Sequence, residues 1–258
     1  MGPNCFGMAD ASSVHTPLPT GAEVHLIKHD GEATASEIKY YQQIIGSLLY
    51  VQIGMYPDIS FAVSHLMQYA ANPLPQHICL AKYVLSYLKG MADLHLLYNR
   101  VRGDRLHGYS DSSLGDDAND CHSTLGYVFL LADAVISWTS CKQKTVAQST
   151  THAKYMALAD TANQAAWYRS FLSELSYKVL DPIPLHGDNK GAVDLALNPV
   201  TGKQSKHIPI KHHAIREYVK EKQIELIRTL TNDMIADGFT KPLAQVKLQD
   251  LITGLGLN

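Results

Sequence analysis

Residues 106–143 hold three short runs of sequence that predict neighbouring β-strands. They read LHGYSDSSLG (106–115), LGYVFLLAD (125–133) and AVISWTSCKQ (134–143). Turn-prone Gly, Asp and Asn residues separate the runs, as is usual between strands that pair with each other. This stretch therefore predicts the first half of a β-sheet.

Beyond this stretch the pattern alternates between helix and strand. The predicted elements are, in order, a helix over about 151–175, a short apolar run into HGDN (186–189), a helix from about 190, a helix around PIKHHAIREYVKEKQ (209–223), a strand IELIRTL (224–230) and a last helix near NDMIADGFTKPL (232–243). Strands followed by alternating helices and strands indicate a mixed α/β sheet domain.

Before the strands, the sequence predicts a small all-α unit. Three amphipathic helical patterns follow one another, namely SEIKYYQQIIGSLLYVQIG (36–54), YPDISFAVSHLMQYAANP (56–73) and QHICLAKYVLSYLKG (76–90). The preceding residues are rich in Gly, Pro, Ser and Thr and lack periodicity. We therefore predict a leader or wrapping segment (1–34), a helical segment (35–100) and a sheet domain (101–258).

The composition excludes several classes of protein. With 258 residues, 46% hydrophobic and 18% charged, the chain is long enough and apolar enough to bury a core. No apolar run approaches a membrane span, and the first residues lack a secretory signal pattern. The four cysteines form no C-x-x-C pair and predict reduced thiols. We therefore expect an intracellular protein, in the cytoplasm or the nucleus, that is not secreted.

Three aspartates stand where such a fold could place chemistry. Asp111 lies in the first predicted strand, Asp188 at the end of a strand just before a helix, and Asp237 near the start of the final helix. Such positions can converge at one edge of a sheet, where clustered carboxylates usually bind divalent cations. The alternative is structural, because aspartates also suit turns and helix starts.

Several motifs resemble one known family, in the family's order and over nearly the whole chain. GYSDSSLGDD, HSTLGYVFLL, ISWTSCKQKTVAQSTTHAKYMAL, HGDNKGAVDLALNP, SKHIPIKHHAIREYV and DMIADGFTKPL resemble the ribonuclease H domain of copia-type retrotransposon polyproteins. The segments FGMADASSVHTPLPTGAEV, YYQQIIGSLLYVQIGMYPDISFAVSHLMQYAANP and AKYVLSYLKG resemble the thumb and connection that follow the polymerase palm. No paired-aspartate polymerase motif is present, so we expect no polymerase activity.

The resemblance implies a ribonuclease H-like five-stranded mixed sheet with flanking helices. It also implies cleavage of RNA in RNA–DNA hybrids by two Mg²⁺ or Mn²⁺ ions held by four carboxylates. Position by position, Asp111, Asp188 and Asp237 match three of these carboxylates. The remaining carboxylate, second in the family's order, is a Glu that precedes the tyrosine of an AEYMAL-like helix. Here that segment reads AKYMAL, which places Lys154 at the position.

This departure predicts an impaired site. A lysine in place of the glutamate removes a metal ligand and reverses its charge. At about 4 Å and an effective dielectric of 20, a monocation and a divalent ion repel by roughly 8 kcal/mol. We therefore expect weak or absent metal binding, with Lys154 neutralising the aspartates instead. The resemblance also implies that this Glu contacts a 2′-hydroxyl of the RNA strand, so we expect Lys154 to weaken the discrimination of RNA from DNA.

Three functions remain open. The first is a retrotransposon-derived ribonuclease H unit that binds RNA–DNA hybrid or RNA but cleaves poorly. The second is a working ribonuclease that tolerates Lys154. The third is a recruited protein-interaction module, whose partner is the missing polymerase half or a host protein. A large exposed apolar patch on residues 36–90 would favour the third.

Other residues carry weaker signals. The candidate phosphate contacts are the basic residues Lys203, Lys206, Lys211 and Arg216, and a solvated helix face would explain them equally well. His207, His212 and His213 lack further ligands at zinc spacing. Trp138 and Trp167 are predicted in the core, and His152 is predicted at a helix surface or cap.

Overall fold

The computed structural model describes residues 6, 8, 11–19, 26–99, 105–117, 119–177, 179–198 and 213–257. The chain forms two compact units. One comprises the described residues up to Leu97 together with 119–120 and 241–257, and the other comprises the described residues of 98–117 and 121–240. We call them the helical unit and the sheet unit.

The sheet unit contains five strands in the order β3-β2-β1-β4-β5. The first three strands pair antiparallel, whereas β4 runs parallel to β1 and β5 parallel to β4. The strands are β1 (His107–Ser112), β2 (Thr124–Leu131), β3 (Ala134–Lys142), β4 (Ile183–Gly187) and β5 (Ile224–Arg228). The helices are α4 (Thr150–Glu174), α5 (Lys190–Leu197) and α6 (Ala214–Lys220). This architecture confirms the predicted fold class.

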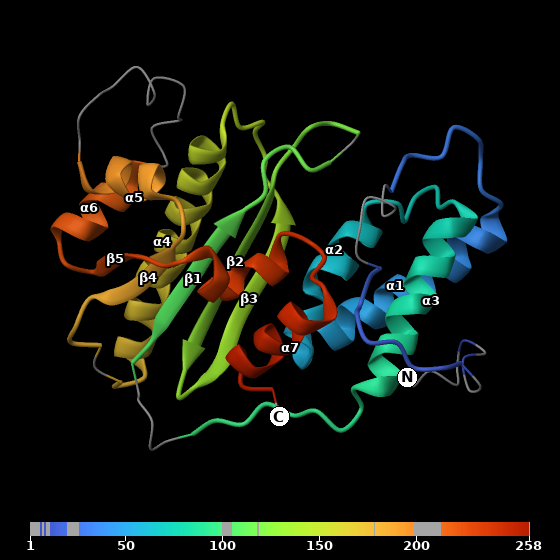
Figure 1. Ribbon diagram of the computed structural model, residues 1–258, viewed down its shortest axis with the longest axis horizontal. Coiled ribbons are helices and arrows are strands. Elements are labelled where there is room, and N and C mark those ends of the chain that lie inside the picture. The colour runs from blue at the N-terminus through green and yellow to red at the C-terminus, as the bar shows by residue number, and fades with distance from the viewer. Residues whose placement is uncertain are drawn as a thin grey trace. The chain divides into compact units, whose positions relative to one another are not determined.

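Helix α4 covers one face of the sheet and supplies much of the core (Figure 1). Its side chains Tyr155, Leu158 and Ala162 are buried with Phe129 of β2 and Leu185 of β4. A hydrogen bond of 2.9 Å also links Thr161 of α4 to Ser110 of β1. The long helix and the central strand are therefore joined by a buried polar contact as well as by apolar packing.

The opposite face of the sheet carries two short 3-10 segments, η5 (Thr231–Asp233) and η6 (Ile235–Phe239). Gly126 of β2 allows η6 to lie directly on the sheet, because a Cβ there would meet the Phe239 Cβ at 2.6 Å and the Thr240 Cγ2 at 2.9 Å. Such distances are shorter than real Cβ contacts. A glycine is therefore required at position 126 by close approach.

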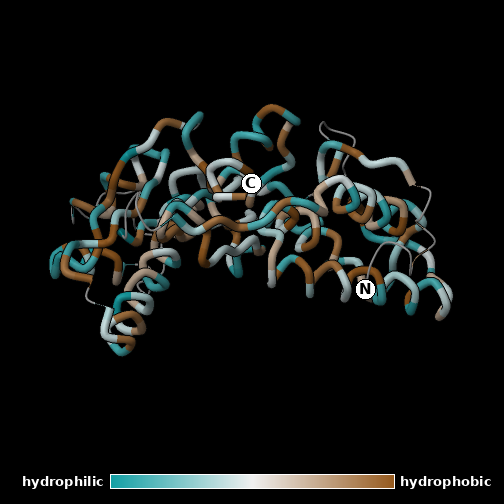
Figure 2. Tube along the Cα trace, turned by 90° about the horizontal axis from the view of Figure 1, so that it is seen from below, coloured by the Kyte–Doolittle hydropathy of each residue, from teal (hydrophilic) through white to brown (hydrophobic). Residues whose placement is uncertain are grey.

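The helical unit is built from α1 (Ala35–Gly54), η2 (Pro57–Ile59), α2 (Ser60–Met67), α3 (Pro75–Gly90) and α7 (Gln245–Gly254). Thr34 and Glu37 form a reciprocal capping box that begins α1. The predicted helices before residue 95 are thus confirmed. In Figure 2, hydrophobic and hydrophilic residues interleave along the helices. No helix among the described residues is long and apolar enough to cross a membrane.

Within the helical unit, polar side chains of residues 69 and 72 hold the segment 26–33, which precedes α1. The Asn72 side chain accepts from the backbone N–H of Ala33 at 2.8 Å and donates to the carbonyl of Gly31 at 2.8 Å. The Tyr69 hydroxyl donates to the carbonyl of Leu26 at 2.6 Å. These bonds satisfy backbone groups that no sheet or helix pairs.

The close approach at Gly126 predicts the outcome of adding one methyl group. Gly126→Ala should lower the free energy of unfolding by about 1–3 kcal/mol, because the new Cβ must displace η6. Gly187→Ala is the matched control in the same sheet, since its Cβ would meet Val193 at an ordinary 3.7 Å. Urea unfolding followed by circular dichroism measures both. Equal stability of the two variants would contradict the close approach.

The helical unit also contains a buried acid whose titration should affect stability. Burial raises the pKa of Asp58 to about 6, although the Tyr87 hydroxyl, which donates to Asp58 at 2.5 Å, partly offsets this. The folded state therefore keeps a proton that the unfolded chain loses near pH 4. Stability should fall as pH rises from about 4 to 6, by up to about 3 kcal/mol.

Asp58→Asn should remove this fall, because asparagine does not titrate and can still accept from Tyr87. Tyr87→Phe should extend the fall to higher pH, because the hydroxyl stabilises the charged carboxylate. Denaturant unfolding at half-unit pH intervals measures the three profiles. Parallel profiles for the parent chain and Asp58→Asn would show that Asp58 does not retain its proton.

Candidate active site

Asp111 lies at the penultimate position of β1 and is buried, with 3% of its surface exposed. Its partner across the β1–β2 ladder is Gly126. Because Gly126 has no side chain, η6 can reach Asp111 from that face of the sheet. The Thr240 hydroxyl, directly after η6, donates to the Asp111 Oδ2 at 2.6 Å.

Lys154 lies in the second turn of α4. The helix begins after Ser149, whose side chain accepts from the backbone N–H of His152 at 3.1 Å. From there the Lys154 Nζ reaches the Asp111 Oδ1 at 2.8 Å and the two carboxylate oxygens of Asp188 at 2.6 and 2.7 Å. One ammonium group therefore joins two carboxylates.

Asp188 occupies the turn between β4 and α5, as predicted. It directly follows Gly187, the last residue of β4, and Asn189 caps α5 by accepting from the backbone N–H of Ala192 at 2.9 Å. Because β4 runs parallel to β1, the two strands end at the same edge of the sheet. This brings Asp188 beside Asp111, with Lys154 between them.

Asp237 is also at this site, although its predicted setting was wrong. It lies in the 3-10 segment η6 rather than near the start of the final helix, which begins only at Gln245. Pro242 explains the difference, because proline disfavours helical backbone in the residue before it and cannot donate a helix hydrogen bond. Asp237 is 5% exposed and its carboxyl group shares a side-chain hydrogen bond with Asp111.

The charges of the site stabilise one another. Burial alone would raise the pKa of Asp111, but the Lys154 ammonium, helped by Thr240 and Asp237, outweighs burial and holds that pKa below its usual range. Burial alone would lower the pKa of Lys154, but Asp111 and Asp188 outweigh it and hold that pKa above its usual range. Both groups are therefore charged at neutral pH.

This arrangement does not fit the pair of divalent cations that the resemblance implies. An ammonium nitrogen stands within 2.8 Å of both Asp111 and Asp188, where a shared cation would have to lie. In the described part of the chain, no group of three or more His, Cys, Asp or Glu side chains is arranged to hold a metal ion. Lys154 therefore supplies the positive charge that these carboxylates require.

Of the four predicted phosphate-binding residues, Arg216 is the one that lies among the described residues. Lys203, Lys206 and Lys211 lie outside the described residues. Arg216 donates from Nε and Nη2 to the carbonyl of Leu195, at 3.2 and 2.9 Å. The guanidinium group thus joins α6 to α5, and only its remaining donors could reach a phosphate.

Two of the histidines considered in the sequence, His152 and His213, are described, and each lies within hydrogen-bond distance of another residue of the sheet unit. His207 and His212 lie outside the described residues, whereas the His213 Nδ1 is 2.8 Å from the Tyr155 hydroxyl. His152 was predicted at a helix surface or cap, but it is buried in the first turn of α4, whose N-cap is Ser149, and its Nδ1 accepts from the backbone N–H of Gln148 at 3.2 Å.

The prediction that Trp167 belongs to the core was wrong. Its side chain is 52% exposed and stacks on Phe171 one helical turn away. Trp138 is half-buried. The site also contains Thr240, which the sequence analysis did not single out. Its position three residues after Asp237, within the same motif, was the available signal.

No protein family model matches the chain. The chain is 36% identical over 250 residues to a retrovirus-related Pol polyprotein from transposon RE2 of Arabidopsis thaliana. The aligned region covers 97% of this chain and 17% of that protein. It is 32% identical to a retrovirus-related Pol polyprotein from transposon TNT 1-94 of Nicotiana tabacum, over 95% of this chain and 18% of that protein. The chain thus spans less than a fifth of these relatives.

Among solved structures, an RNase H1 isolated from compost is similar to 53% of this chain and to 93% of its own length, with 14% identity and a TM-score of 0.41. Both Pol polyproteins align with almost every residue of this chain, across the helical unit as well as the sheet unit. The sheet unit has the five-stranded mixed sheet that the resemblance implied, and the chain belongs to the family of retrovirus-related Pol polyproteins of copia-type transposons.

Proposed function

We propose that the sheet unit is a ribonuclease H-like domain that binds RNA–DNA hybrid or RNA but cleaves it poorly or not at all. The contact of Lys154 with Asp111 and Asp188 carries this proposal. These carboxylates would have to hold the metal ions of the reaction, and here they hold an ammonium group.

Two physical effects combine against metal binding. The lysine offers no lone pair in its charged form, so the site has one ligand fewer than the resemblance requires. Its ammonium would also repel any cation that approached the same oxygens. Replacing it would mean breaking three contacts of 2.6–2.8 Å and moving a charge out of a largely buried position. The runner-up is a nuclease that tolerates Lys154 at high metal concentration.

The partners of the proposed function follow from the family. The relatives are Pol polyproteins, so RNA–DNA hybrid and RNA are the expected ligands of a ribonuclease H-like domain, and the basic run Lys203, Lys206, Lys211 supports phosphate contacts. We place the chain inside the cell, and the described cysteines Cys79, Cys121 and Cys141 are free thiols, consistent with that compartment.

Restoring the missing carboxylate tests this proposal. The chain and its Lys154→Glu variant are incubated with labelled RNA–DNA hybrid and Mg²⁺, and cleavage is measured by gel electrophoresis. Lys154→Glu should raise the rate by on the order of 100-fold or more, because a complete carboxylate set can hold the metal ions. Lys154→Met separates the two effects, since it removes the repelling charge without adding a ligand, and it should restore little activity.

Two further results decide the interpretation. Asp111→Asn in the Lys154→Glu background should abolish the regained cleavage, which would exclude a contaminating nuclease. In a thermal melt, low-millimolar Mg²⁺ should raise the melting temperature of Lys154→Glu but not of the parent chain, because stabilisation follows RT ln(1 + [L]/Kd). A parent chain as active as the variant would refute the impaired-site proposal.

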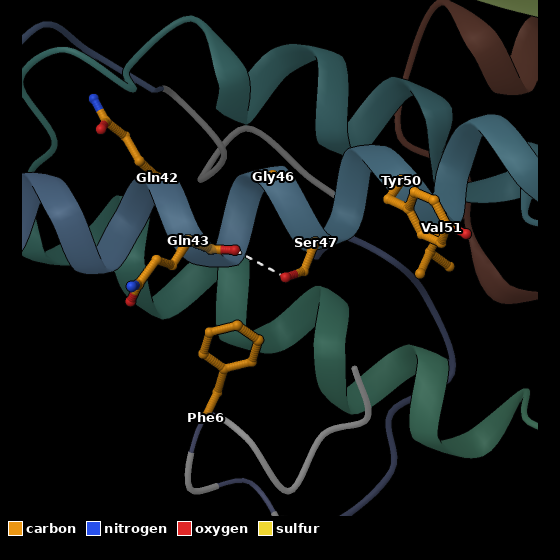
Figure 3. Close-up of a pocket in the computed structure, with 7 residues that line it drawn as sticks. All are labelled: Phe6, Gln42, Gln43, Gly46, Ser47, Tyr50 and Val51. Carbon is orange, nitrogen blue, oxygen red and sulfur yellow. Dashed lines mark hydrogen bonds between the residues drawn. The ribbon is translucent and has the colours of Figure 1, made fainter.

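A second candidate function, protein interaction, is favoured by the exposed surface of the helical unit. Tyr50, Ile53 and Met55 are 83%, 70% and 61% exposed at the end of α1. Beside them lies a pocket of about 610 Å³ (Figure 3), lined by Phe6, Gln42, Gln43, Gly46, Ser47, Tyr50 and Val51. Large exposed apolar side chains on neighbouring turns are typical of interaction surfaces. We propose that this surface binds the polymerase part of a Pol polyprotein.

This candidate predicts binding without added nucleic acid. The polymerase segment of a full-length relative, expressed separately, should bind the chain in isothermal titration calorimetry. A Tyr50→Ser, Ile53→Ser double variant should weaken binding by about tenfold or more, since exposed aromatic anchors often dominate such interfaces. Leu230→Ser, at a residue 70% exposed in the sheet unit, is the control. Equal binding by both variants would exclude this surface.

A further inference from the structure

Gln143 is a buried amide that lies between the two elements that carry the site. It directly follows the last residue of β3 and is 6% exposed. Its Nε2 donates to the carbonyl oxygen of Ala153 at 2.9 Å and to the Ser112 Oγ at 3.2 Å. Ala153 belongs to α4 and Ser112 to β1.

The two acceptors are the chain neighbours of the charged residues. Ser112 follows Asp111, and Ala153 precedes Lys154. A single amide group therefore fixes the distance between the strand end that presents Asp111 and the helical turn that presents residue 154. Among the described residues, the Gln143 side chain bonds to Ser112 and Ala153 rather than to either charged side chain, so it acts on the charged groups through their neighbours.

The backbone of Gln143 is held equally firmly. Its N–H donates to the carbonyl of Ser123 at 2.7 Å, and its own carbonyl lies 2.6 Å from the His122 Nδ1. Both partners belong to the loop between β1 and β2. The backbone of Gln143 is therefore held in place, and the two hydrogen bonds that its side chain donates hold β1 and α4 at a set distance from it.

The orientation of this amide leaves its oxygen buried and, among the described residues, unpaired, which lowers the stability of the folded state, and a nonpolar residue would not have this effect. The Gln143 Oε1 is buried and has no hydrogen-bond partner among the described residues. Burying an unpaired acceptor is unfavourable, and a methionine of similar size would not incur that cost. A glutamine at this position is therefore best explained by the two bonds that its NH₂ group donates.

We propose that Gln143 is a positioning residue that aligns residue 154 with Asp111. In this chain it holds the Lys154 ammonium against the two carboxylates. In a variant with a carboxylate at position 154, it would hold that carboxylate within reach of the same site. The second statement rests on the proposed function, whereas the first concerns the parent chain alone.

The exposure of the Lys154 amine tests the first statement. The parent chain and Gln143→Met are treated briefly with an amine-acetylating reagent, and mass spectrometry measures the acetylation rate of Lys154 relative to the exposed Lys39. Gln143→Met should raise this ratio by about tenfold, by analogy with the roughly 10-fold or larger losses of affinity or activity when a residue that orients the ligands of a site is replaced. Ser112→Ala, which removes only one of the two bonds, should raise it less.

Thr161→Val is the matched control for a merely structural effect. It removes another buried hydrogen bond between α4 and β1, at 2.9 Å to Ser110, two turns of helix away from Lys154. It should leave the acetylation ratio unchanged even if its melting temperature falls as far as that of Gln143→Met. Two results would overturn the proposal. One is an equal acetylation ratio in Gln143→Met and Thr161→Val, and the other is a ratio unchanged from the parent chain in both Gln143→Met and Ser112→Ala.

A second measurement keeps this inference separate from the proposed function. In the Lys154→Glu background, Gln143→Met should lower hybrid cleavage by about tenfold and Thr161→Val should not. If Lys154→Glu alone is inactive, the proposed function fails while the acetylation ratio of the parent chain still decides the role of Gln143. Undiminished cleavage in the Gln143→Met, Lys154→Glu double variant would contradict positioning.

Discussion

The geometry of the site depends on the charge interaction between the Lys154 ammonium and the carboxylates of Asp111 and Asp188. Two parallel strands end side by side at one edge of the sheet, and each presents an aspartate there. Buried carboxylates at such short range require a cation, because otherwise they repel one another and lose their hydration. Lys154 is that cation, and it comes from α4, the helix that also supplies the core of the sheet unit.

The opposite face of the sheet contributes through contact rather than charge. Gly126 lets η6 lie against β2, and this contact brings Asp237 and Thr240 to Asp111. The site is thus assembled from both faces of one sheet. The position of each charged group is therefore set by the packing of its own element as well as by the charges around it.

The two units of the chain differ in the surfaces that they present. The sheet unit holds the charged site, whereas the helical unit holds exposed apolar side chains and a pocket beside α1. The relatives are several times longer than this chain.

Sequence by itself determined the fold class and the three early helices, because periodicity and motif order are local properties of the chain. The resemblance added the prediction of a site at Asp111, Lys154, Asp188 and Asp237. The proximity of Lys154 to both aspartates followed from the resemblance, but only the tertiary structure decided its contacts, since these depend on strand register and on the turn of α4 that faces the edge of the sheet. Thr240 and Gln143 escaped the sequence analysis because their partners lie far away in the sequence. The setting of Asp237 and the exposure of Trp167 were mispredicted for a related reason: helical pattern alone shows neither where proline ends a turn nor which face of a helix lacks a neighbour.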